Sequence, residues 1–248
     1  MRRKKISAAL SALLVIGIAY GAVAYFALPE FWTVHDRHLA DRISNFLTTT
    51  PQGIPGDPIN VGLIGTKEEM LRGFHKAGWS AADPITLRSS IDIGLSVALD
   101  RPDDDAPVST LLYEGRRQDL AFEKLAGESA DRRHHVRFWK TSVLDDDGRP
   151  LWLGSASFDR GVGFSHDTGQ ITHHIAPDID AERNNVIDSL LEAHVISSVD
   201  EAVGIGKTTD GHNGGGDPYF TDGMIKIGVL VPESESPPKP VQNSASPN

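Results

Sequence analysis

The sequence predicts an α+β fold: a single N-terminal transmembrane helix followed by one domain with a mainly antiparallel sheet and two or three packed helices. Three observations support this class. The run Ile6–Leu28 carries no charge and is long enough to span a bilayer. Several strand-like segments follow one another through turn residues, which favours antiparallel pairing. Two amphipathic segments with helical spacing stand apart from these strands.

The N-terminal segment predicts a single-pass anchor. At about 1.5 Å per residue, Ile6–Leu28 covers a hydrocarbon core of about 30 Å. The basic residues of Met1–Lys5 predict a cytoplasmic N-terminus, with the domain on the periplasmic or extracytoplasmic side. The alternative is a signal peptide cleaved after Ala22–Ala24. The apolar run is longer than a usual signal core and continues past Ala24, which favours the anchor.

The whole chain divides into four expected parts. These are the basic end and anchor (1–32), a connector (33–56), the folded domain (57–231) and a disordered Pro- and Ser-rich tail (232–248). Within the connector, residues 34–47 have the spacing of a short amphipathic helix, which prolines and glycines then interrupt.

Composition limits the class of partner and of chemistry. The net charge of the 248 residues is −10, so the domain lacks the basic surface that a nucleic acid requires, and we expect no nucleic-acid partner. The absence of cysteine excludes disulfides, thiolate zinc sites and a cysteine nucleophile. Composition identifies no cofactor and no protein partner.

The elements of the domain follow from local patterns. A helix over 66–79 begins with a capping box at Thr66 and Glu69 and ends at Gly78. A tight turn at Asp146–Gly148 joins two strands as a hairpin. The weaker helical pattern lies at 85–99, and a stronger one lies at 178–194. Strands are expected at 59–65, 109–115, 118–125, 133–144, 150–158 and 223–232.

Two histidine pairs, in "RRHHVRFW" (132–139) and "ITHHI" (171–175), suggest a site. Side chains alternate between the two faces of a strand. His134 then shares the core face with Val136 and Phe138. The opposite face carries a row of donors and one aromatic ring, namely Arg133, His135, Arg137 and Trp139. At most one histidine of each pair can face a common site, which argues against a site with four histidines.

Charged residues further along the chain extend this site. Asp159 and Arg160 are expected to end a strand, just before glycines that force a turn. Asp180 and Glu182 lie in the first turn of the helix 178–194, where capping and the helix dipole give an alternative explanation worth about 0.3–1 kcal/mol each. Arg183 points along the core stripe of that helix. Its guanidinium therefore needs a carboxylate or a bound anion, and Asp159 is one candidate partner.

Three interpretations of these residues remain open: an anion site, a metal site of one histidine from each pair with a carboxylate, or a hydrogen-bonded sheet surface. The arginines favour an anion site, because guanidinium groups bind anionic oxygens. No HExxH-type spacing is present, so we assign no metal. In such a site a histidine acts as general acid or base. The catalytic candidates are His135, Asp159, His173, His174 and Asp180. The ligand-binding candidates are Arg133, Arg137, Arg160, Glu182 and Arg183.

The glycine-rich stretch 210–223 has two interpretations. It lacks the spacing of a Walker loop. It is either a long surface loop or a flexible lid and backbone anion nest near the site, with His212 and Asp217 at its rim.

Long ordered segments of the chain resemble the LssY C-terminal domain family. They are "DPINVGLIGT", "AGWSAADPITLRSS", "RPDDDAPVSTLLYEGRRQDLAFEK", "ADRRHHVRFWK", "WLGSASFDRGVG" and "THHIAPDIDAERN", with "NGGGDPYFTDG" beyond them. Related domains occur fused to membrane modules of the DedA and lipid-phosphatase types, which implies membrane association and envelope lipid chemistry. This chain carries no lipid-phosphatase signature, so that activity is not transferred.

Two functional hypotheses follow. The first is a membrane-anchored cell-envelope protein whose outer domain binds an anionic small molecule or lipid and hydrolyses a phosphorylated or lipid-derived substrate. The second is a non-catalytic binding or scaffold module for envelope transport or secretion.

Overall fold

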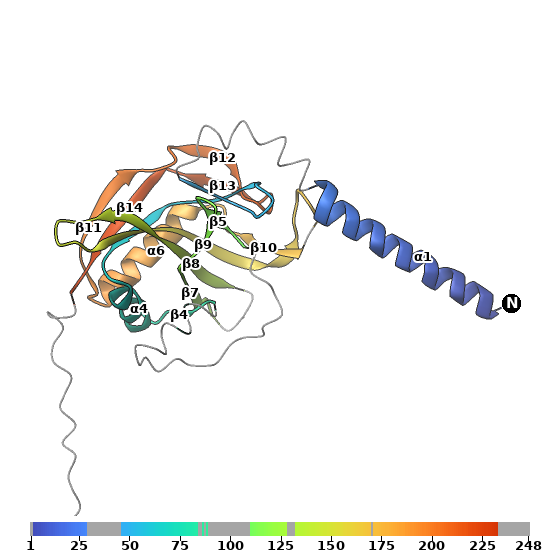
Figure 1. The fold of residues 1–248 in the computed structure, drawn as a ribbon, viewed down its shortest axis with the longest axis horizontal. Helices are drawn as coiled ribbons and strands as arrows, with labels where there is room; N and C mark the ends of the chain where they lie inside the picture. The colour runs from blue at the N-terminus through green and yellow to red at the C-terminus, as the bar shows by residue number, and fades with distance from the viewer. Residues whose placement is uncertain are drawn as a thin grey trace, which may run out of the picture.

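A twisted eight-stranded sheet forms the centre of the computed structural model of this chain (Figure 1). The structure describes residues 2–28, 46–83, 86, 88, 110–127, 132–169 and 171–232. Strands outnumber helices, and nearly all strand pairs are antiparallel. The predicted α+β class with a single N-terminal helix is therefore confirmed.

The strand order of the large sheet is β11-β14-β3-β9-β8-β7-β4, and β10 pairs with the far end of β9. Only the pair of β14 and β3 is parallel among the described strands of this sheet. The strands are β3 (Val61–Ile64), β4 (Ser80–Ala81), β7 (Leu120–Leu125), β8 (Arg133–Leu144), β9 (Pro150–Phe164), β10 (Ile171–Ile175), β11 (Ile196–Val203) and β14 (Met224–Leu230).

Two helices, α4 (Lys67–Lys76) and α6 (Ile179–Glu192), pack on the main hydrophobic core. The capping box that the sequence predicts at the start of α4 is present, with Thr66 and Glu69 bonded to each other's backbone N–H. Phe74 from α4 stacks on Phe122 at a ring-centroid distance of 4.0 Å. Val136 and Phe138 of β8 are fully buried in the same core, as the alternation predicts.

The opposite face of β8 is also buried, because a smaller sheet covers it. This sheet has the order β2-β1-β5-β6 and consists of β1 (Leu47–Thr49), β2 (Pro55–Pro58), β5 (Leu112–Tyr113) and β6 (Arg116–Arg117). Tyr113 packs against Trp139 with ring centroids 5.8 Å apart. The polar row of β8 therefore lies between two sheets, and β1 and β2 arise from the end of the region expected to be a connector.

Two expectations about the chain path are wrong. β9 does not turn after Arg160 but continues through Gly161 and Gly163 to Phe164, because these glycines pair with β10 across a bulge. The stretch 210–223 is not one long loop. It contributes to a hairpin of β12 (Thr208–His212) and β13 (Pro218–Thr221).

Some expectations fall outside the described residues. These are the connector helix apart from its last two residues, most of the helical pattern at 85–99, and the tail beyond residue 232. Strand β11 was not predicted from the sequence.

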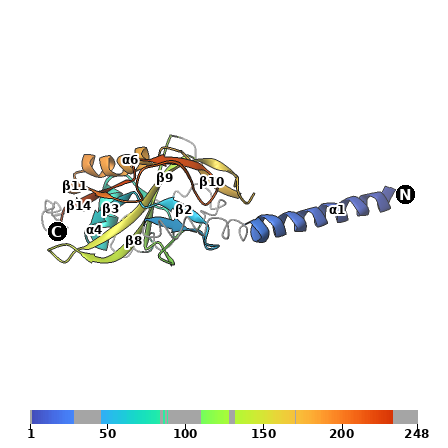
Figure 2. The same cartoon turned by 90° about the horizontal axis from the view of Figure 1, so that it is seen from above.

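The N-terminal helix α1 (Arg2–Ala22) extends away from the domain, and a π-helical turn, η1 (Val23–Ala27), continues it (Figures 1 and 2). Leu10–Ala27 is long and apolar enough to cross a membrane, a property that a signal sequence shares. Only 6% of this window is buried, so the helix is not part of the domain core. The Tyr20 hydroxyl donates a hydrogen bond to the Gly169 carbonyl, between β9 and β10.

Candidate functional site

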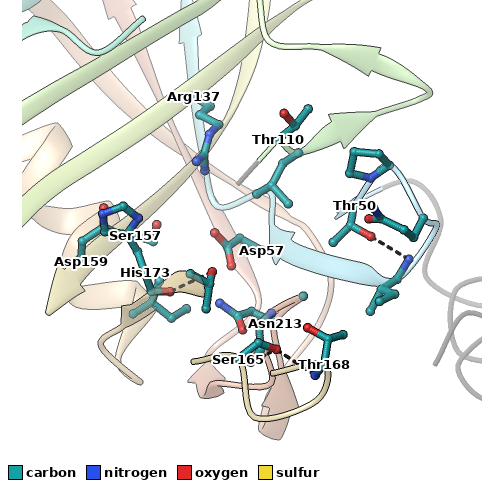
Figure 3. Close-up of a pocket in the computed structure, with 18 residues that line it drawn as sticks. Thr50, Asp57, Thr110, Arg137, Ser157, Asp159, Ser165, Thr168, His173 and Asn213 are labelled. Atoms are coloured by element: carbon teal, nitrogen blue, oxygen red, sulfur yellow. Dashed lines mark hydrogen bonds between the residues drawn. The ribbon is translucent and has the colours of Figure 1, made fainter. Parts of the chain in front are cut away.

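A pocket of about 210 Å³ opens between the two sheets (Figure 3). Its wall is mixed, with hydroxyl, carboxyl, imidazole and guanidinium groups beside apolar side chains. The polar side chains labelled in Figure 3 belong to Thr50, Asp57, Thr110, Arg137, Ser157, Asp159, Ser165, Thr168, His173 and Asn213.

The pairing of β8 with β9 positions part of this wall. Residues directly opposite each other on neighbouring strands project from the same face. Arg133 lies opposite Asp159, His135 opposite Ser157, and Arg137 opposite Ser155. The predicted alternation of β8 therefore places its polar row against the polar row of β9.

Arg133 connects three strands at one end of the site. Its Nη1 donates to Glu123 on β7 at 3.1 Å, and its Nε donates to Asp159 on β9 at 3.2 Å. Its Nη2 lies 3.0 Å from His173 Nε2 on β10. Because a guanidinium only donates, His173 accepts through Nε2. These contacts fix one catalytic candidate, His173, at the pocket wall.

Arg137 is the central cation of the pocket. Its side chain projects from β8 toward the pocket (Figure 3), and the residue is 6% exposed. Burial lowers the pKa of Arg137, while the charges of Asp57 and Asp159 oppose that change. Burial also raises the pKa of Asp57 and of Asp159, with Arg137 opposing it in both cases. The site therefore holds two carboxyl groups that bind protons more readily than an ordinary aspartate.

His135 lies in the same buried layer but does not line the pocket. Burial lowers its pKa well below the ordinary value of 6.5, and the nearby charges of Arg137 and Arg133 add to this effect. The imidazole is therefore neutral at physiological pH, where it can accept or donate a proton without carrying a buried charge.

The other histidine of each pair is directed elsewhere. His134 Nδ1 lies 2.7 Å from Glu182 Oε2 on α6. Burial raises the pKa of Glu182, and the bond to His134 opposes it. His174 Nδ1 lies 2.7 Å from Asp217 Oδ1. The two members of each pair thus lie in different surroundings, as expected of strands.

The helix residues form a separate ion-pair network. Arg183 binds Asp222 in a bidentate manner, at 2.7 and 3.0 Å, and lies 3.3 Å from Asp180. The prediction that Asp159 pairs with Arg183 is therefore wrong, because Asp159 bonds to Arg133 instead. Asp180 also accepts from the Thr221 hydroxyl at 2.6 Å. Neither Asp180 nor Arg183 lines the pocket, nor does Glu182, and Arg160 is exposed.

Several pocket residues were missed. Asp57 is the first residue of the predicted domain, and a carboxylate between prolines and glycines before a buried strand is a usable signal for it. Asn213 belongs to the glycine-rich stretch that was considered as a lid, and Gly214 and Gly215 join it in the wall. His166 lies in no motif that the sequence patterns single out.

The described residues include one group that could hold a metal ion, consisting of His166, His174 and Asp217. One ligand atom from each residue lies within 4.8 Å of the others. From the sequence, His174 was a site candidate and Asp217 was placed at the rim of a possible lid, whereas His166 gave no signal. The metal interpretation left open there drew one histidine from each pair, but in this group His166 replaces the histidine of the first pair.

Comparison with protein families identifies the chain. The model of the family described as LssY C-terminus matches residues 38–225, more than half of the chain. The protein therefore belongs to the LssY C-terminal domain family, as its sequence segments indicate. No curated protein and no solved structure matches it.

Proposed function

We propose that this chain is a membrane-anchored cell-envelope protein whose outer domain binds an anionic ligand in the Arg137 pocket and hydrolyses a phosphoester or related bond. One observation carries the proposal. The guanidinium of Arg137 lies at the wall of a pocket beside Asp57 and Asp159, two carboxyl groups whose pKa burial raises. Such a combination supplies a fixed cation and an acid–base pair.

The chemistry assigns one role to each group. Arg137 holds the anionic oxygens of the ligand, since a guanidinium binds them in a bidentate manner. The carboxyl group that is protonated donates its proton to the leaving oxygen. The ionised one removes a proton from the attacking water. One product thus gains the hydroxyl group of water and the other gains a proton. The proton held by the two carboxyl groups has moved from one of them to the other.

Attachment to the membrane is the second part of the proposal. The apolar window Leu10–Ala27 is the anchor, with the basic end in the cytoplasm and the domain on the periplasmic or extracytoplasmic side. The bond from Tyr20 to Gly169 places the C-terminal part of the helix beside the β9–β10 connection. Phe164 on that hairpin is 65% exposed, which suits a surface near lipid.

The test uses the full chain in detergent, with inorganic phosphate as the probe in titration calorimetry. Chromogenic phosphate monoesters and diesters then report on turnover. Arg137→Met should weaken phosphate binding at least about tenfold, since it removes the cation. Arg160→Ala, which removes an exposed arginine outside the pocket, is the matched control. Equal phosphate affinity in wild type and Arg137→Met would contradict the proposal.

A reporter fused after Trp32 tests the orientation separately. An extracytoplasmic signal is expected, and a cytoplasmic signal would contradict it. Release of the domain by signal peptidase would show that the apolar segment is a signal peptide instead of an anchor.

A second function, as a non-catalytic binding or scaffold module for envelope transport or secretion, is favoured by the charge balance of the site. Arg133 is engaged by Glu123 and Asp159, and Arg137 faces Asp57 and Asp159. Acidic groups thus offset both arginines, which suits a polar ligand of low charge. Ligand binding without turnover of any phosphoester would support this function over hydrolysis.

A further inference from the structure

A second cluster of side chains converges beside the pocket, outside the group around Arg137. His166 lies in the turn after β9, His174 lies on β10, and Asp217 precedes β13. His174 Nδ1 is 2.7 Å from Asp217 Oδ1, and His166 Nε2 is 3.6 Å from the same oxygen. The two imidazole rings lie 5.1 Å apart, centroid to centroid.

These separations match those of metal ligands. Bonds of about 2.0–2.1 Å in a tetrahedral site place neighbouring ligand atoms roughly 3.3 Å apart. The two distances from Asp217 Oδ1, 2.7 and 3.6 Å, lie on either side of this value. All three ligand atoms, including the two imidazole nitrogens, lie within 4.8 Å of one another, so they face one region of space.

The carboxylate of the cluster is fixed by its surroundings. The second carboxylate oxygen of Asp217 accepts from the Ile175 backbone N–H at 3.0 Å. The backbone N–H of Asp217 donates to the side-chain oxygen of Asn213. The Asp217 side chain is 1% exposed, whereas that of His166 is 63% exposed. The cluster is therefore accessible from solvent on the side of His166, which gives an ion a path of entry.

The backbone around the cluster leaves no room for other side chains. A Cβ at Gly163 would lie 2.5 Å from His174 Nε2, and one at Gly216, where φ is +80°, would lie 2.9 Å from the Cβ of His166. Both histidines thus pack directly on glycine backbone. The His174 ring approaches Asp217 closely because Gly163 carries no side chain there, and Gly216 leaves room for the Cβ of His166.

We propose that His166, His174 and Asp217 bind a divalent transition-metal ion, with Zn²⁺ as the best fit. Two imidazole nitrogens and one carboxylate oxygen are the ligand types of Zn²⁺, whereas Ca²⁺ and Mg²⁺ prefer oxygen alone. Three protein ligands leave one tetrahedral position for water or for a ligand atom. Thr172, Asn213 and Gly215, which are neighbours of the cluster, line the pocket, so the ion belongs to its rim. The proposal does not depend on the role assigned to Arg137.

The experiment measures metal binding directly. The full chain in detergent is stripped with a chelator, titrated with Zn²⁺ alone, and analysed for metal after dialysis. We expect one tightly bound Zn²⁺ per chain and a rise in Tm on adding Zn²⁺, since the ion binds only the folded state. His166→Ala should weaken Zn²⁺ binding by more than about tenfold, and its exposed position makes loss of folding no concern.

Two further variants complete the test. Asp217→Asn keeps an acceptor for the Ile175 N–H but loses the charge, and it should also lose Zn²⁺. His212→Ala removes an exposed histidine of the adjacent strand β12 and should bind Zn²⁺ like wild type. The proposal is overturned if the wild type binds no Zn²⁺ at millimolar concentration. It is equally overturned if His166→Ala and Asp217→Asn bind it with unchanged affinity.

Discussion

Arg137 and Arg183 are both buried, at 6% and 3% exposure, and each faces two aspartates, yet their surroundings give them opposite properties. Burial lowers the pKa of Arg137, whereas the bonds and charges of Asp222 and Asp180 raise that of Arg183 despite burial. Correspondingly, the pKa of Asp222 is lowered, and those of Asp57 and Asp159 are raised. Arg183 and Asp222 are in direct bidentate contact and form a structural ion pair. The charges around Arg137 line a pocket, which leaves them open to exchange of protons and ligands.

The largest expected effect separates the two arginines by pH. Arg137→Met should lower the free energy of unfolding by about 3 kcal/mol at pH 8, because buried Asp57 loses its facing cation and Asp159 keeps only Arg133. The cost should fall to about 1 kcal/mol at pH 5, where these carboxyl groups bind protons more fully. Arg183→Met should cost about 2 kcal/mol at both pH values, since half-exposed Asp222 stays ionised. Urea unfolding of the full chain at each pH measures both.

That comparison fails if Arg137→Met and Arg183→Met show the same dependence on pH. Such a result would mean that the aspartates beside Arg137 stay ionised throughout this range, like Asp222.

His135 gives a second test of the comparison, at acidic pH. Its folded-state pKa is lowered by burial, so its contribution to stability is complete above pH 6.5 and is lost as the pH falls through the folded-state value. Wild type should therefore lose up to about 1.4 kcal/mol per pH unit below 6.5 relative to His135→Gln. Unfolding curves at pH 7.5 and 5.5 give this difference. Parallel losses in the two proteins would contradict the buried neutral imidazole.

A smaller effect is expected from Asp57→Asn. The raised pKa of Asp57 means that its stabilising contribution is present below pH of about 3.9 and is lost as the pH rises through the folded-state value. The variant should therefore be more stable than wild type by about 1 kcal/mol at pH 8, with the gain disappearing in acid. It should also bind sulfate, whose charge is constant, more tightly at pH 8. A stability loss at pH 8 would show that the Asp57 carboxylate is needed to hold Arg137.

The smallest effect is expected at Arg160, which was a ligand-binding candidate from the sequence. It is exposed and lies outside the pocket, so Arg160→Ala should change the free energy of unfolding by less than about 0.5 kcal/mol. Phosphate affinity measured by calorimetry should stay within twofold, or roughly 0.4 kcal/mol, of wild type. A larger loss would place the binding site on the β9 surface near Arg160 and away from the Arg137 pocket.

Local patterns were sufficient for the elements that form by themselves. The capping box at Thr66, the glycine at Gly78 and the alternation along β8 are determined by neighbouring residues, and the structure confirms each of them. The end of β9 was mispredicted, because glycines that break an isolated strand are accommodated once β10 pairs with them. Local sequence does not state whether such a partner exists.

The site depends far more on distant contacts. The polar face of β8 correctly indicated that Arg133, His135 and Arg137 lie together, but it could not indicate that a second sheet buries them. Asp57 approaches Arg137 from a separate part of the chain, and their proximity follows only from the packing of β2 on the large sheet. Arg183 binds Asp222 and not Asp159 for the same reason. Tertiary packing determines which carboxylate meets the arginine, and spacing along the chain does not.

The β9–β10 hairpin carries two contacts that were described separately. At its turn, Gly169 accepts the hydroxyl of Tyr20 from α1, and on β10, His173 accepts from Arg133 at the pocket wall. The hairpin therefore joins the N-terminal helix to the pocket wall by two polar contacts. Under the proposed function, this hairpin connects the membrane anchor to the ligand pocket.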